Sequence, residues 1–224
     1  MKEKILKIIV FIVFFILLLI GIDIGRNMFI LKKLQNKGSK FSVENNYSIK
    51  AYEFQGARKI DYELYKKDDK ALLKITNTSN KDKVTITYVK NKNEINTYVD
   101  ANNEKIVRSN LEDTMPEFIN WLYTENIWQL IVSATKSSIH TEICNGKRCY
   151  KINEMDWGGT LGDRTEDNAK YIDKETGLIV RKRNGTLEVE NEKTDVIVDY
   201  HYIFGNVSDE DLNKTDADEY ILAE

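Results

Sequence analysis

The first apolar stretch of the chain runs from Ile5 to Ile24, with no charged or polar side chain between Ile8 and Ile22. A helix needs about 20 residues to cross roughly 30 Å of hydrocarbon. The uncharged part is shorter than that, but long basic side chains at both ends can extend to the headgroups. Residues 5–24 therefore predict a membrane-spanning helix, within an anchor that we assign to residues 1–31.

A cleaved signal peptide is the alternative to an anchor. No small-residue cleavage pattern and no cysteine for lipidation follow the apolar run, which favours an uncleaved signal anchor. The basic flank after the helix would favour a cytoplasmic domain under the positive-inside rule. The basic N-terminal tail instead resembles the start of a signal sequence, so we expect a single-pass cell-membrane protein with its C-terminal domain on the extracytoplasmic side.

The hydrophobic pattern changes to period two after residue 46. The preceding segment, residues 32–46, is polar and aperiodic, which is typical of a linker. Apolar and polar side chains then alternate, as expected for antiparallel strands with one buried face. These strands are predicted at 47–55, 59–67, 71–79, 83–91, 94–102 and 104–110.

Helical spacing of apolar side chains replaces the alternation at 116–136, with an interruption near Glu125–Asn126. Strands then return, including a hairpin at 170–185 and a long strand that ends at Phe204. An acidic tail, residues 213–224, closes the chain. This order predicts an α+β fold, in which a transmembrane helix precedes an antiparallel sheet with a helix packed on it.

Charge is divided unevenly along the chain. Residues 1–40 carry a net charge of +6, and the remainder carries −9, for a total of −3. An acidic domain repels phosphate backbones, which excludes nucleic acid as a partner. The basic segment beside the apolar run suits anionic lipid headgroups.

Two turns in the last third of the chain resemble the outer-membrane lipoprotein carrier (LolA-like) superfamily. The matching residues are Ile172, Asp173, Thr176, Gly177 and Leu178 in a hairpin, and Val207, Ser208, Asp209 and Asp211 in a later turn. The similarity is strongest over 170–212 and looser from about residue 47, so we assign a LolA-like domain to 47–212.

The resemblance implies a curved antiparallel half-barrel with helices lying across its concave face around an apolar cavity. Family members with known roles bind acyl chains or serve as envelope-stress sensor domains. This chain departs from the soluble carriers by its predicted anchor, and a tethered protein cannot shuttle between two membranes unless its linker spans the gap.

Cys144 and Cys149 are the only cysteines, and only His140 and His201 could join them as zinc ligands. The C-x4-C spacing also differs from the usual C-x2-C of zinc sites, which disfavours a metal. If Gly146-Lys147 forms the two-residue turn between them, the cysteines face each other closely enough to bridge. If Asn145-Gly146 forms it, they lie diagonally and too far apart. We favour the first register, which predicts a disulfide and an oxidising compartment.

The candidate ligand-binding residues share an apolar or aromatic character. They are Ile86, Tyr88, Trp121, Trp128, Ile131, Tyr200, Tyr202 and Phe204. An ordinary sheet-on-helix core explains such a set. The functional interpretation is the lining of a cavity for an acyl chain or similar apolar ligand.

No nucleophile–base pair and no metal-ligand spacing is evident, so we expect neither enzyme activity, nor a cofactor, nor a metal. The leading hypothesis is a membrane-tethered extracytoplasmic domain that binds a lipid or other hydrophobic ligand. The alternative is an envelope sensory or structural module with a filled core, which engages an envelope protein partner.

Overall fold

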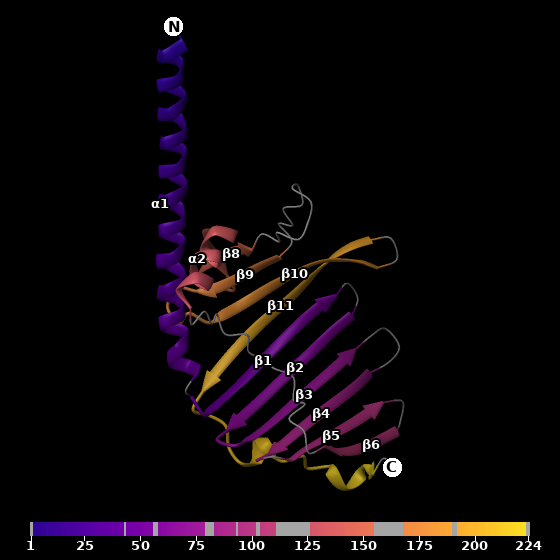
Figure 1. Cartoon of the computed structure of the whole chain (residues 1–224). Coiled ribbons are helices and arrows are strands. Elements are labelled where there is room, and N and C mark those ends of the chain that lie inside the picture. Colours follow the sequence, from indigo (N-terminus) through magenta and orange to yellow (C-terminus); the bar gives the residue numbers. More distant parts are fainter. Residues whose placement is uncertain are drawn as a thin grey trace.

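The computed structural model describes residues 2–42, 44–55, 58–78, 83–92, 94–101, 104–110, 126–154, 168–189 and 192–222. In these ranges the chain is an α+β protein, as the sequence predicts. A long N-terminal helix stands beside a large open sheet that is mostly antiparallel (Figure 1).

Helix α1 (Lys2–Ser42) is much longer than the apolar segment with which it begins. We expected residues 32–46 to form an aperiodic linker, but the helix continues through this segment to Ser42. The reason is that Leu31 and Leu34 lie on one face of the helix and are buried among residues of the folded domain. The linker prediction was wrong for residues 32–42, because helix α1 continues there and packs against the domain.

Among the described residues, α1 is the helix that is long and apolar enough to cross a membrane, by length and composition. Its hydrophobic side chains from Ile5 to Ile22 are exposed. A signal sequence near the N-terminus has the same properties.

Within the described ranges, twelve strands form one sheet in the order β12-β6-β5-β4-β3-β2-β1-β11-β10-β9-β8-β7 (Figure 1). All neighbours pair antiparallel except β12 and β6, which are parallel. The strands are β1 (Asn46–Gln55), β2 (Arg58–Lys67), β3 (Lys70–Thr78), β4 (Lys83–Asn91), β5 (Glu94–Ala101), β6 (Glu104–Asn110), β7 (Ser137–Cys144), β8 (Lys147–Glu154), β9 (Asn168–Asp173), β10 (Ile179–Val189), β11 (Glu192–Phe204) and β12 (Ile221–Leu222).

The register places apolar side chains of neighbouring strands in rows across the sheet. One row runs through Tyr202, Ile49, Leu64, Leu73 and Tyr88, on five adjacent strands from β11 to β4. Side chains two residues apart on a strand point to the same face of the sheet. The neighbouring rows, two positions before and after this one, therefore enlarge the same apolar surface. The alternation of apolar and polar positions explains why the predicted limits of β1 to β6 agree with the structure to within one residue.

Helix α2 (Ile127–Lys136) begins after Asn126, whose side chain accepts a hydrogen bond of 3.0 Å from the backbone N–H of Trp128. The helix expected at 116–136 is confirmed for this part, whereas 116–125 lie outside the described residues. One buried cluster joins α1 and α2 to strands β7 to β10. Its members are Leu31, Leu34, Leu130, Ala134, Ile139, Ile152, Ile172 and Ile179.

The chain after β11 crosses the opposite face of the sheet. Val207 and Leu212 pack against Leu72 of β3 in a second buried cluster. The turn between them is held by Asp211, which accepts hydrogen bonds from the backbone N–H and the hydroxyl of Ser208 at 2.8 and 2.7 Å. Two short 3₁₀ turns, η1 (Glu210–Leu212) and η2 (Ala217–Glu219), precede β12.

Candidate functional site

Strand β11 carries three stacked aromatic rings on one face of the sheet. The ring centroids of Tyr200 and Tyr202 are 6.3 Å apart, and those of Tyr202 and Phe204 are 6.5 Å apart. Alternate positions on a strand point to the same side, which is why the three rings form one row. Phe41 of α1 completes the row, with its ring centroid 4.6 Å from that of Phe204.

Neighbouring strands extend this row into a broad apolar surface, which we call the aromatic face. It consists of Tyr200, Tyr202 and Phe204 together with Tyr47, Ile49, Leu64, Ala71, Leu73, Ile75 and Tyr88. Ile49 and Leu73 are fully buried, whereas the three rings of β11 are only half-buried. The aromatic face therefore combines a packed base with rings that remain partly accessible.

The polar groups of the aromatic face are mainly phenol hydroxyls. Burial raises the pKa of Tyr200 to about 12 and also raises the pKa of Tyr202 and of Tyr47. These hydroxyls are therefore neutral hydrogen-bond donors at physiological pH. Burial and a hydrogen bond of 2.8 Å to the Glu53 carboxylate raise the pKa of Tyr62. Such a surface suits an apolar chain with a few hydrogen-bonding oxygens.

The structure brings most of the predicted ligand-binding residues together, but not all. Tyr88, Tyr200, Tyr202 and Phe204 share the aromatic face, and Ile86 of β4 lies directly opposite Ile75 of β3. Two others are on α2, where Ile131 is half-buried and Trp128 is 70% exposed. Trp121 lies outside the described residues.

The turn between the two cysteines is not the one that we favoured. Cys144 pairs with Lys147, so Asn145-Gly146 is the two-residue turn, with φ of 50° and 74°. Asn-Gly is the best sequence for a type I′ turn, because both central residues need positive φ. Asn145 also donates a hydrogen bond to Asp199 and accepts one from Arg181, each of 3.1 Å.

This register corrects the disulfide prediction. Cys149 faces Glu142, so the two cysteines lie diagonally, and both are free in the structure. Diagonal positions are about 7–8 Å apart, too far for a relaxed bridge. Both side chains are buried beside Ala169, Tyr171 and Val180. The cysteines serve as small core residues and do not indicate a compartment.

Both thiols should resist alkylation in the native chain. Burial raises the pKa of Cys144 and raises that of Cys149 from 9.0 to about 11. The reactive thiolate of Cys149 is then about 100-fold scarcer at neutral pH, so iodoacetamide labelling should slow by at least that factor. Mass spectrometry should find two labelled cysteines after denaturation but not before it, and no reductant should be needed. If the denatured chain contains no reactive thiol, that result would instead support the predicted disulfide.

The hairpin turn between β9 and β10 has the chemistry that its sequence predicts. The buried carboxylate of Asp173 accepts hydrogen bonds from the backbone N–H of Glu175 at 3.0 Å and from the Thr176 hydroxyl at 2.9 Å. Gly177 has a φ of 75°, which only glycine adopts without strain. Leu178 then returns the chain into the buried core.

Sequence reasoning missed that this turn docks on α1. A Cβ atom at Gly177 would lie 2.5 Å from the carbonyl oxygen of Leu34 and 2.7 Å from the backbone N of Gly38. The amine of Lys37 donates a hydrogen bond to the carbonyl oxygen of Lys174 in the same turn. The signal that could have revealed the contact is Gly38, a glycine inside the helix that allows close backbone approach.

A second missed residue is Asn27 of α1, which is 1% exposed. Its side-chain amide donates hydrogen bonds to the carbonyl oxygens of Ala134 at 3.2 Å and Ser137 at 2.9 Å. The last carbonyls of a helix lack partners within the helix. Asn27 therefore caps the C-terminal end of α2 from a different helix.

Comparison with known proteins gives limited similarity. No known family model matches the chain, and no curated protein matches it. Among solved structures, the chain is similar to one in the complex of MucA and MucB from Pseudomonas aeruginosa, with 9% identity and a TM-score of 0.39. The match covers 84% of this chain and 61% of that chain, so this protein spans less than two-thirds of its neighbour.

Proposed function

We propose that this protein is a membrane-tethered, extracytoplasmic and non-enzymatic domain that binds a lipid acyl chain or another hydrophobic ligand on its aromatic face. The observation that carries the proposal is the half-buried row of Tyr200, Tyr202 and Phe204. A ligand that covered these rings would gain roughly 25 cal/mol for each Å² of apolar surface removed from water.

The proposal includes a half-barrel of the LolA-like kind, with α1 on its concave side. Its support is that the domain end of α1 contacts the aromatic face through Phe41 and Phe204. Tyr200 also packs against both the aromatic face and the cluster that holds α1 and α2. Ligand pockets are lined mainly by hydrophobic and aromatic side chains with a few polar groups, which is the composition of this region.

Membrane tethering is supported by the continuity of α1. Its first half exposes a continuous apolar surface, and Ile24 and Asn27 already contact the folded domain. Little unpacked chain therefore separates the apolar segment from the domain, which favours an anchor over a cleaved signal. We assign the domain to the extracytoplasmic side from the basic N-terminal tail.

Photo-crosslinking can test ligand binding. The full chain in nanodiscs would be irradiated with a diazirine-labelled fatty acid, and adducts would be mapped by mass spectrometry. We expect adducts on β3, β4 and β11 in addition to those on the apolar part of α1. Tyr202→Lys should reduce the strand adducts by tenfold or more, because an unpaired buried charge costs more than about 1.4 kcal/mol.

Ile203→Lys is the matched control, since Ile203 is adjacent, 51% exposed and on the opposite face. It should leave the adducts unchanged. Wild-type adducts confined to α1 would contradict ligand binding. That result would favour the alternative, a sensory or structural module with a filled core that engages an envelope protein.

A further inference from the structure

Helix α2 is fastened to α1 immediately after the apolar segment. Asn27 bonds the carbonyls of Ala134 and Ser137, and the Arg26 side chain donates to the carbonyl of Ile139 at 3.5 Å. Leu130 and Ala134 form the buried side of α2. The end of α2 is therefore level with residues 26–27 of the anchor helix.

Helix geometry places this level at the edge of the hydrocarbon. The uncharged stretch from Ile8 to Ile22 is centred near residue 15. Half of a hydrocarbon layer of roughly 30 Å corresponds to about 10 residues at 1.5 Å each, which puts the boundary near residue 25. Beyond it lies an interfacial layer of roughly 5–8 Å, and this layer includes the next turn of α1.

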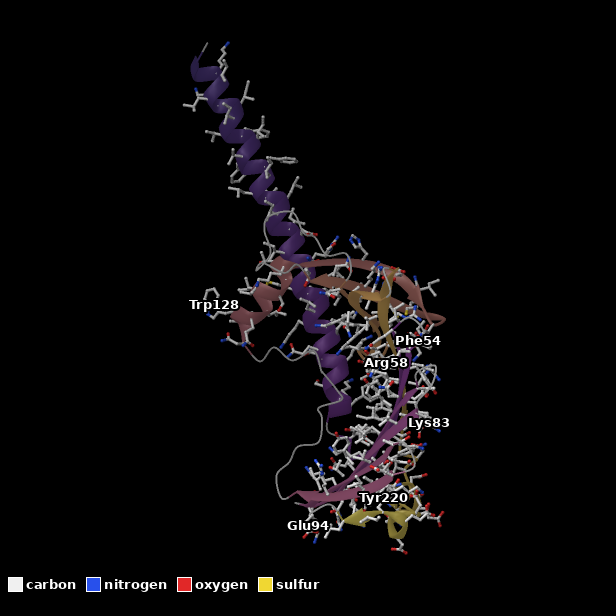
Figure 2. All side chains as sticks on the ribbon, turned by 90° about the vertical axis from the view of Figure 1, so that its right-hand side faces the viewer. Phe54, Arg58, Lys83, Glu94, Trp128 and Tyr220 are labelled. Carbon is white, nitrogen blue, oxygen red and sulfur yellow. The ribbon has the colours of Figure 1, made fainter. Side chains whose placement is uncertain are left out.

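The outer side of α2, which lies beside this part of α1 (Figure 2), is apolar. Ile127, Trp128 and Val132 are 56%, 70% and 50% exposed, and Phe29 on α1 is 70% exposed. Figure 2 shows Trp128 pointing away from both the sheet and α1. The apolar surface of α1 therefore continues onto a second helix just past the predicted boundary.

The charges near α2 are also suited to a lipid surface. The helix contains no acidic residue, and Lys136 in its last turn is its only charged side chain. Lys32 and Lys33 are exposed on the following turn of α1. Tryptophan favours the interface of a bilayer, and lysine favours its headgroups.

We propose that α2 lies in the interfacial layer of the membrane that α1 crosses, with Ile127, Trp128 and Val132 inserted among the lipids. This proposal rests on the membrane tethering proposed above and is independent of ligand binding. The two helices then form a rigid two-point attachment, which sets the height and orientation of the sheet relative to the bilayer.

Depth-dependent fluorescence quenching tests the proposal. The full chain with Trp121→Phe and Trp157→Phe keeps Trp128 as its only tryptophan and would be reconstituted in phosphatidylcholine vesicles. Lipids brominated at shallow acyl carbons should quench Trp128 strongly, and lipids brominated near the chain ends should quench it less. Trp128→Phe in the otherwise natural chain should remove the same quenched component.

The control chain carries Phe54→Trp with all three tryptophans replaced by phenylalanine. Phe54 is 43% exposed and lies on the sheet away from α1 and α2 (Figure 2), so its probe should not be quenched. Alkaline washing first separates chains that stay with the vesicles from chains that do not. If the chains stay but Trp128 is quenched no more than the control probe, the α2 proposal alone is overturned. Chains that wash off would overturn both the tethering and the α2 proposal.

Discussion

Gly177→Ala should lower the free energy of unfolding by about 2–5 kcal/mol. A residue with a Cβ atom at a φ of 75° is strained by roughly 1–2 kcal/mol. The new Cβ would also lie 2.5 Å from the Leu34 carbonyl oxygen and 2.7 Å from the Gly38 nitrogen. Both are backbone atoms of α1 that cannot rotate away, and such overpacking adds about 1–3 kcal/mol. Chemical denaturation of the full chain in nanodiscs, followed by near-ultraviolet circular dichroism, measures the change.

Gly146→Ala provides the matched control. Gly146 has nearly the same φ, 74°, but a Cβ atom there would meet nothing within 4 Å. Only the backbone strain should appear, at about 1–2 kcal/mol. The difference between the two variants measures the contact between the hairpin turn and α1. Equal losses would show that Gly177 is needed for its turn alone.

Asn27→Ala should be another strongly destabilising change, at about 2–6 kcal/mol. It removes two hydrogen bonds and leaves the carbonyls of Ala134 and Ser137 without their donor in a buried site. Each buried carbonyl left unpaired costs about 1–3 kcal/mol. The loss should be local, because α2 packs against β7 to β10, which β11 and β1 separate from β2 to β4 in the sheet order.

Hydrogen exchange measured by mass spectrometry separates this local effect from global unfolding. Amides of α2 should exchange faster in Asn27→Ala, while those of β2 to β4 should keep their protection. Asn36→Ala on the same helix is the control, because Asn36 is exposed and its backbone continues the helix unchanged. Unchanged exchange in α2 would contradict the capping role.

Local chemistry explains what could be predicted of the fold. Strands β1 to β6 alternate apolar and polar side chains so regularly that only one register buries their apolar face. The turn at Asp173 to Leu178 was likewise predictable, since Asp, Thr and Gly each have a specific role within a few residues. The aromatic row of β11 follows from the same period of two.

Contacts between distant segments could not be predicted in this way. Residues 32–42 have too few apolar side chains to indicate a helix, and their helicity depends on Leu34 packing against the sheet. The cysteine hairpin allowed two turns, and Asn145 settles the register through bonds to Arg181 and Asp199, which are more than 30 residues away. The exposure of Trp128 depends on which side of α2 faces α1.

By itself, the sequence determined the apolar segment, the alternating strands and the turn residues of this protein, because each depends on side chains within a few positions. The tertiary structure alone decided that the end of helix α1 packs into the core, that Gly177 and Asn27 contact α1 and α2 closely, and that the cysteines do not face each other. These features depend on backbone approach and burial between segments over 100 residues apart, or on a choice between two turns of similar local quality.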